Sequence, residues 1–479
     1  MDSSGDTPRG PLLPDPGATP VSRRTVLKGV AGVAGLAGVS AFLAACGAAA
    51  TPAPTPAAAA SAAPPSTGAA SAAPPPASPT GSLTIGSNHS DPAEHKGMDA
   101  VNAAFTKATG IQVKMNTVDH NTFQDQISSY LGGTPQDDFT WFSGHRMRFF
   151  AAQGLATPID DVWNSVKSNF TSAFATSVTG DDGHVYGIPV DYYPWAVFYR
   201  KSVFQTHNYQ IPTTWDDFKT LCQKMQKDGL TPIAFADKDG WPAMGTFDIL
   251  DLRLNGYDFH IGLLTGKQKW TDPKVATVFQ KWAEITPYYT PGFAGMTWQQ
   301  GADTLVRKQS GMTMFGLFIS QEFAATGNPA DLNDLDFFPF PAMGTPYDAE
   351  KALDAPIDIW MMSAKSPTLQ QDLASAKAYL EFWSKGSTQL LMFQQAPGFI
   401  PTANDADTSG YSPLQKKAVQ IVSQAQKITQ FFDRDSRPDF AGANGMQSFL
   451  LKFLQNPKQN LAPLMNQIQQ FWDSLPPET

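Results

Sequence analysis

The sequence predicts an α/β protein built on a parallel sheet, and three observations near the start of its body support this. Residues 82–86 (SLTIG) form a short apolar run typical of a buried strand, and the polar residues 87–97 after it are expected to form a loop. Residues 98–110 place an apolar stripe on one helical face and end at Gly110. Residues 111–118 (IQVKMNTV) then alternate as a second strand. Strand, helix and strand in this order begin a parallel sheet.

The pattern continues along the chain. The clearest capped helix spans residues 213–229, with Thr214 as its N-cap and Gly229 as its stop. Further helices are predicted at residues 122–131, 274–285, 370–384, 413–428, 446–456 and 464–475. Strands are predicted at residues 137–142 and 231–236, a glycine-punctuated turn at 143–154, and extended aromatic-rich chain at 184–204. The body, Gly81 to Thr479, is long enough for two domains.

Residues 22–47 resemble a bacterial export signal. Arg23 and Arg24 precede an apolar run, Val30 to Ala45, that is too short and too rich in Gly and Ala to span a membrane. The arginine pair resembles a twin-arginine signal, and the run ends in a sequence similar to a lipobox, whose Cys46 would carry the lipid. We therefore expect residues 1–45 to be a lipoprotein signal peptide. The alternative is an ordinary secretory signal with a chance cysteine.

Residues 46–80 are expected to be the lipidated Cys46 followed by a disordered Ala/Pro/Ser tether, because this segment has no charge and no large apolar side chain. After the signal is removed, only Cys222 remains, so no intramolecular disulfide can form. Its place in a helical run favours a core role over a reactive thiol.

The charge balance argues against nucleic acid as a partner. The chain carries a formal net charge of -9, which becomes about -10 once the signal is removed. No cluster of Lys or Arg overrides this balance locally. Solubility and weak nonspecific binding are the simpler consequences of such a charge.

Five segments of the body carry a resemblance to a known family. They are VYGIPVDYYPWAVFYRKSVF (185–204), PTTWDDFKTL (212–221), DGLTPIAFADKDGWPAM (228–244), TWQQGADTLVRKQSGMTMFGLFI (297–319) and APIDIWMMSAKS (355–366). In this order they resemble segments of the bacterial extracellular solute-binding proteins of family 1, the lipid-tethered receptors of sugar-importing ABC transporters. The resemblance covers nearly all of the body.

The resemblance implies an α/β, periplasmic-binding-protein-like fold of type II, with two discontinuous lobes joined by hinge strands. Lobe 1 would comprise residues 81–195 plus 358–402, and lobe 2 residues 196–357 plus 403–479. It also implies a monomeric receptor without enzymatic activity that closes on a mono- or oligosaccharide and delivers it to membrane permeases. The chain has no phosphate-binding loop or nucleophile motif, so partner subunits would use the ATP, and we expect no cofactor.

Candidate ligand-binding residues are aromatic rings, which suit the apolar faces of a sugar, and polar groups, which suit its hydroxyls. Taken singly, each tryptophan could equally belong to a core, and Asp191 could serve in a salt bridge or turn. Asp433, Arg434 and Arg437 are expected to form an internal ion-pair network, with a cleft contact as the alternative. The candidates are His89, Asp91, Glu94, Trp141, Asp191, Tyr192, Trp195, Trp241, Trp298, Phe318, Asp358 and Trp360.

Two other functions remain open. A ferric-iron receptor could use adjacent tyrosines such as Tyr192 and Tyr193, although neighbours on a strand point to opposite faces. Zinc is disfavoured because the histidines lack a tight ligand spacing, and we predict no metal site. A secreted glycoside hydrolase would also carry aromatic platforms and paired carboxylates, but no segment resembles a hydrolase signature.

Overall fold

The structure, a computed structural model, describes residues 81–478. Its first sheet has seven strands in the order β12-β5-β11-β3-β1-β2, with β4 paired to β11. Neighbours β2, β1 and β3 run parallel, whereas β11 is antiparallel to β3, β4 and β5. The strands are β1 (Ser82–Ser87), β2 (Gln112–Thr117), β3 (Asp138–Phe142), β4 (Ala156–Thr157), β5 (Gly187–Tyr192), β11 (Ile357–Ser363) and β12 (Ile400–Pro401).

The second sheet has four strands in the order β7-β8-β6-β9. Its centre is antiparallel, since β6 pairs with both β8 and β9, and only β7 and β8 run parallel. These strands are β6 (Trp195–Arg200), β7 (Thr231–Ile233), β8 (Ser310–Gly316) and β9 (Leu335–Phe338). A separate two-stranded ladder joins β10 (Leu353–Asp354) to β13 (Ile428–Thr429).

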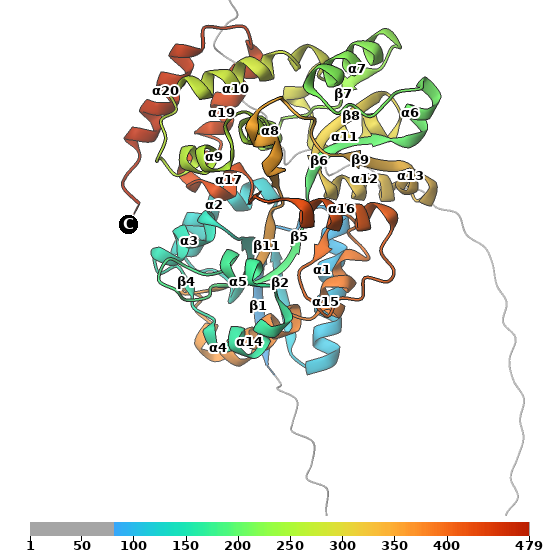
Figure 1. Cartoon of the computed structure of the whole chain (residues 1–479). Helices are drawn as coiled ribbons and strands as arrows, with labels where there is room; N and C mark the ends of the chain where they lie inside the picture. The colour runs from blue at the N-terminus through green and yellow to red at the C-terminus, as the bar shows by residue number, and fades with distance from the viewer. Residues whose placement is uncertain (1–80, 479) are drawn as a thin grey trace, which may run out of the picture. The chain divides into compact units, whose positions relative to one another are not determined.

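The helices cover both sheets and supply most of the remaining chain. In Figure 1, α1, α14 and α15 lie beside the first sheet, and α6 and α7 lie with the second. The helices are α1 (Pro92–Thr109), α2 (His120–Gly132), α3 (His145–Ala152), α4 (Asp160–Val166), α5 (Ser172–Ser177), α6 (Lys201–His207), α7 (Trp215–Lys227), α8 (Pro242–Asn255), α9 (Tyr257–Leu264), α10 (Pro273–Ala283), α11 (Trp298–Val306), α12 (Ser320–Ala325), α13 (Pro329–Asp334), α14 (Leu369–Trp383), α15 (Gly386–Phe393), α16 (Pro413–Gln424), α17 (Phe432–Asp435), α18 (Pro438–Ala441), α19 (Met446–Gln455) and α20 (Leu461–Ser474).

The chain crosses between the two sheets at three places. It leaves the first sheet between β5 and β6, returns between β9 and β11, and leaves again after β12, when α16 packs against β9. The β10–β13 ladder ties the second and third crossings together. The crossing segments therefore lie close together between the two sheets. The residues of the site described below are found in this region.

Most of the predicted elements are confirmed. The strand–helix–strand start appears as β1, α1 and β2, and β1 and β2 are parallel. Thr214 caps α7 by accepting a hydrogen bond from the backbone N–H of Asp217. Cys222 is fully buried in that helix, as its place in the helical run predicts.

Two local predictions were wrong. The polar segment after β1 is helical from Pro92, because proline suits the first turn of a helix, so Glu94 lies in α1 and not in a loop. The turn expected at residues 143–154 contains the helix α3, which is bounded by Gly144 and Gly154, both with positive φ. The predicted signal peptide (1–45), Cys46 and the tether (46–80) lie outside the described residues. Within residues 81–478, no helix combines the length and apolarity that crossing a membrane requires.

Candidate functional site

A cavity of about 320 Å³ lies where the two sheets' elements meet, and we call it the central cavity. Its walls come from the loops after β1 and β2, from the segments beside β6 and β8, and from the crossing segments. The lining residues are Asn88, His89, Ser90, Asp91, Glu94, Asp119, His120, Asn121, Gln124, Tyr193, Trp195, Lys238, Asp239, Trp241, Thr297, Trp298, Gln299, Phe318, Asp358, Phe399, Phe431, Asp433 and Arg434.

One wall of the central cavity is aromatic. Trp298 stacks on Phe315, with ring centroids 5.6 Å apart, and meets Phe318 edge to face at 5.3 Å. Trp195 contacts Trp241 and Phe318 and lies 4.9 Å from the Phe431 ring. Phe431 keeps this position although its φ is 102°, a conformation that costs a non-glycine residue free energy. The rings hold one another in place and present flat apolar faces to a ligand.

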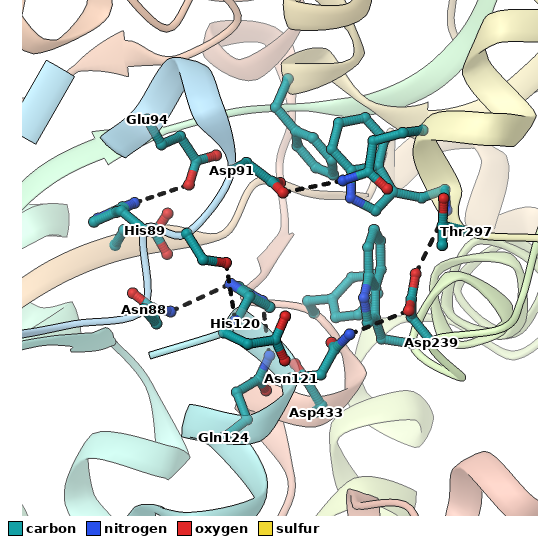
Figure 2. A pocket seen from close by; sticks show the side chains of 18 of the residues that line it. Asn88, His89, Asp91, Glu94, His120, Asn121, Gln124, Asp239, Thr297 and Asp433 are labelled. Carbon is teal, nitrogen blue, oxygen red and sulfur yellow. Dashed lines mark hydrogen bonds and ion pairs between the residues drawn. The ribbon is translucent and has the colours of Figure 1, made fainter. Parts of the chain in front are cut away.

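The opposite wall carries His89 and Glu94, joined by a 3.0 Å contact between Nδ1 and Oε2 (Figure 2). Burial lowers the pKa of His89, but its hydrogen bond with Glu94 and the neighbouring carboxylates outweigh that effect, so the pKa is raised. Burial raises the pKa of Glu94, but hydrogen bonds from His89 and Gln321 outweigh it, so the pKa is lowered. Both shifts favour an ion pair beside the cavity.

Asp91 lies beside this pair and is less favourably placed for a charge. Burial, together with the charges of Glu94 and Glu322, raises the pKa of Asp91 to about 7. Its Oδ1 accepts a hydrogen bond from Nε2 of Gln299 at 3.0 Å. Near neutral pH, this carboxyl group can therefore donate or accept a hydrogen bond.

His120 begins α2 and lies on the same side of the cavity. Its Nε2 is 2.8 Å from the Gln124 amide nitrogen, and its Nδ1 is 3.4 Å from that of Asn88. Burial lowers the pKa of His120, so the neutral imidazole is favoured. A neutral histidine between two amides offers a ligand polar contacts without a net charge.

The floor of the cavity is built on the crossing segments. Arg434 donates to Oδ1 of Asp358 and to the hydroxyl of Tyr193, each at 2.7 Å. Asp358 pairs across strands with Asp191, which is 1% exposed and keeps Oδ1 without a hydrogen-bond partner. Burial and the charge of Asp358 raise the pKa of Asp191 well above its usual range. Asp358, Arg434 and Tyr193 therefore form the floor, and the buried carboxyl group of Asp191 lies directly beneath it.

Three hydrogen bonds link residues of α1 and α2 to residues that follow the strands of the second sheet. Gln299 donates to Asp91, Gln321 donates to Glu94 at 3.1 Å, and Asn121 donates to Asp239 at 3.2 Å (Figure 2). In each case a side-chain amide meets a carboxylate. The two sides of the cavity are thus joined by hydrogen bonds between side-chain amides and carboxyl groups.

The structure brings most of the predicted site residues together. His89, Asp91, Glu94, Trp195, Trp241, Trp298, Phe318 and Asp358 all line the central cavity. Asp433 and Arg434 meet both expectations held for them, because they pair with Arg146 and Asp358 and also line the cavity. Arg437 pairs instead with Asp439.

Four predicted residues do not line the cavity. Trp141 is 1% exposed and packs among Phe123, Phe142 and Phe150, and Trp360 is equally buried against Tyr379 and Trp383. The two side chains fill the core on opposite faces of the first sheet, Trp141 against α2 and α3 and Trp360 against α14. The adjacent Tyr192 contacts Phe174 and leaves only Tyr193 at the cavity, and Asp191 lies beneath the floor.

Several cavity residues were missed from the sequence. His120 and Asn121 follow β2, just as His89 follows β1, and the carboxyl ends of parallel strands meet at one edge of a sheet. That rule could have identified them. No comparable signal marks Phe399 or Phe431, which reach the cavity only through the path of the crossing segments.

The donor set suits an organic ligand better than a metal. In the part of the chain that the structure describes, no three His, Cys, Asp or Glu side chains are grouped so that they could hold an ion. Flat rings on one wall and carboxylates, amides and histidines on the other suit a small molecule with an apolar face and several hydroxyl groups.

Comparison with known proteins agrees with this architecture. Residues 89–385 match the family described as bacterial extracellular solute-binding protein. The solved structure of the bacterial solute receptor AcbH, described as having an exclusive preference for β-D-galactopyranose, is 42% identical. It superposes with a TM-score of 0.78, covering 83% of this chain and 99% of that one.

Two curated relatives extend the comparison. An uncharacterised ABC transporter extracellular-binding protein, PH1214 of Pyrococcus horikoshii, is 26% identical over 70% of this chain and 74% of its own length. The alpha-glucosides-binding periplasmic protein AglE of Rhizobium meliloti is 23% identical over 78% of this chain and 84% of its own length. With its two-lobe α/β fold and its cavity between two sheets, this chain belongs to the bacterial extracellular solute-binding proteins.

Proposed function

We propose that this protein is the substrate-binding receptor of an ABC importer and that it captures a carbohydrate in the central cavity. The observation that carries the proposal is the pairing of an aromatic wall, formed by Trp195, Trp241 and Trp298, with a wall of carboxylates and amides. A pyranose ring has an apolar face that stacks on such rings and hydroxyls that bind such polar groups.

The relatives favour a ligand built from hexose units. The solute receptor that is 42% identical is described as binding β-D-galactopyranose, and AglE is described as binding alpha-glucosides. A cavity of about 320 Å³ falls at the small end of the range for small-molecule sites. A single hexopyranose is therefore the ligand that we propose first.

Each polar group has a role in this proposal. Glu94 and Asp358 accept hydrogen bonds from sugar hydroxyls, while His89 and Arg434 donate. Trp298, Trp241 and Phe318 contact the apolar face of the ring. The protein does not alter the sugar chemically, and the captured ligand passes to membrane permeases.

The placement of the chain in the cell is part of the same proposal. Cys46 carries a lipid that holds the receptor, a monomer, at the outer face of the cytoplasmic membrane, after twin-arginine export. The lobes follow the boundaries given above, 81–195 plus 358–402 and 196–357 plus 403–479. The membership of β5 and β11 in one sheet and of β6 and β9 in the other supports them.

Calorimetric titration against D-galactose, D-glucose, D-mannose, lactose, melibiose and maltose tests the function. Binding of at least one sugar with a rise in the melting temperature is expected, because a ligand that binds only the folded state stabilises it. Chromatography of the recovered sugar should show no new product. If no sugar in the panel binds to folded protein, or if a disaccharide is cleaved, the receptor proposal is wrong.

A further inference from the structure

The central cavity has a neighbour across a thin partition. A second cavity of about 370 Å³, which we call the outer compartment, shares Asn121, Gln124, Lys238 and Asp239 with the central cavity. The two spaces therefore lie on opposite sides of the same few side chains. The hydrogen bond from Asn121 to Asp239 spans this shared wall at 3.2 Å (Figure 2).

The partition is held in place from both sides. Asn121 stands in the first turn of α2, whose N-cap, Asp119, accepts from the backbone N–H of Thr122 at 3.0 Å. Asp239 also accepts from the backbone N–H of Trp298, at the start of α11, at 3.5 Å. The bridge thus joins two helix N-termini, and no aromatic ring stands between the two spaces there.

The two compartments differ in chemistry. The outer compartment is lined by charged and amide side chains, including Arg146, Asp237 and Gln447, and by no aromatic residue. Several of its lining residues are exposed or half-buried, so it faces solvent. It can bind hydroxyl groups through hydrogen bonds, but it offers no ring on which a sugar could stack.

We propose that the Asn121–Asp239 hydrogen bond is a specificity element that restricts the ligand to a single sugar ring. The central cavity holds the ring that stacks on tryptophan, and the bridge blocks the path along which a second ring would continue into the outer compartment. Removal of the bridge joins the two spaces and admits a disaccharide. This inference rests on the proposed function, because it assumes that the central cavity binds a sugar.

The test compares wild type with Asn121→Ala, in calorimetric titrations with the monosaccharides and disaccharides of the panel above. Wild type is expected to bind a monosaccharide and to reject disaccharides that contain it. In the variant, the affinity ratio of disaccharide to monosaccharide should rise by about tenfold or more. Asp239→Ala, which removes the acceptor of the same hydrogen bond, should raise the ratio in the same direction.

A second variant separates loss of the partition from loss of a contact across the cavity. Gln321→Ala removes a hydrogen bond of the same chemistry, to Glu94, but Gln321 does not line either space. This variant should weaken the binding of monosaccharides and disaccharides alike and leave the ratio of their affinities unchanged. Asn164→Ala, on the exposed surface of α4, controls for the substitution itself.

The outcomes distinguish the two proposals. If wild type binds no sugar, the proposed function fails and the partition fails with it. If wild type binds monosaccharide and disaccharide alike, or if Asn121→Ala keeps the wild-type ratio, the receptor proposal stands and the partition is refuted. If the ratio of disaccharide to monosaccharide affinity rises equally in Gln321→Ala, the partition is also refuted. Hydrogen bonds across the cavity in general, and not the Asn121–Asp239 partition, would then set the selectivity.

Discussion

Arg434 and Asp358 form a buried ion pair, with 2.7 Å between Nη1 and Oδ1, that joins helix α17 to strand β11 of the first sheet. The guanidinium also lies 4.0 Å from the ring centroid of Phe142 and donates to Tyr193. A single side chain therefore fixes the floor of the cavity, the start of the first crossing and one face of β3.

Arg434→Met is expected to lower the free energy of unfolding by about 3 to 5 kcal/mol, because it leaves Asp358 as a buried charge without its partner. Urea unfolding monitored by circular dichroism measures the loss. The double variant Arg434→Met with Asp358→Asn should recover part of it, since the uncompensated charge is then gone. A loss below about 1 kcal/mol in the single variant would contradict this account of the floor.

Trp298→Ala should weaken sugar binding by about 1 to 3 kcal/mol, because Trp298 is one of the rings of the aromatic wall. Trp360→Phe provides the contrast. Trp360 is packed against Tyr379 and Trp383, so this change should lower stability by about 1 to 3 kcal/mol without altering affinity. Titration calorimetry and thermal unfolding of both variants separate the two effects, and an unchanged affinity in a folded Trp298 variant removes that residue from the site.

Asp91→Asn should make the protein less sensitive to pH. The pKa of Asp91 rises from its ordinary 3.8 to about 7 on folding, so the folded state binds the proton more tightly. The free energy of unfolding that Asp91 contributes therefore falls as pH increases between these two values. The melting temperature of the variant, relative to wild type, should rise from pH 4 to about pH 7 and level off above that.

The control for this prediction is Asp258→Asn on α9, where the carboxylate stays in solvent. Its melting temperature relative to wild type should stay flat across the same range. A flat difference for Asp91→Asn as well would show that its carboxyl group is ionised in the folded protein throughout.

Gly398→Ala should impair both folding and ligand binding. Gly398 has a φ of 110°, and a Cβ there would lie 2.5 Å from the carbonyl oxygen of Leu317 and 2.6 Å from the Cα of Phe318. Both contacts are with backbone atoms, which cannot move away without displacing the chain. Because Phe318 and Phe399 line the cavity on either side of this approach, we expect the affinity to fall by about tenfold or more.

Gly183→Ala is the matched control, since Gly183 also has a positive φ, 83°, but has open space around its Cβ position. It should cost about 1 to 2 kcal/mol of stability from the backbone conformation alone and leave affinity unchanged. Equal losses of affinity in the two variants would mean that the close approach to Leu317 does not matter for binding.

Amphipathic helices and the first strands could be predicted because one face of each meets water. Helix α7 has its buried residues on one side, with Trp215, Phe218, Leu221, Cys222 and Met225 inward, so its period is visible in the sequence. Helix α8 buries nearly every residue from Pro242 to Asn255, including Asp248 and Asp251, so it has no water-facing side, and it was not predicted.

The same physics explains the errors at the site. Strands β3 and β11 are buried on both faces, so their sequences do not alternate, and the direction of each side chain is hidden. Trp141 and Trp360 could therefore be placed on the right strands, but not at the right depth in the sheet. Asp358 and Trp360 point to the same face of β11, yet only Asp358, two residues nearer the start of the strand, lines the cavity.

The order of strands in the first sheet has a consequence for synthesis. Strand β11 lies between β5 and β3, yet it is made only after the whole of β6 to β9 has emerged. A nascent chain that has reached residue 200 would hold β3 and β5 with open edges and nothing to join them, which exposes it to edge-to-edge aggregation. The ribosome must therefore finish the second sheet before the first can close, so the N-terminal half depends on its C-terminal partner to fold.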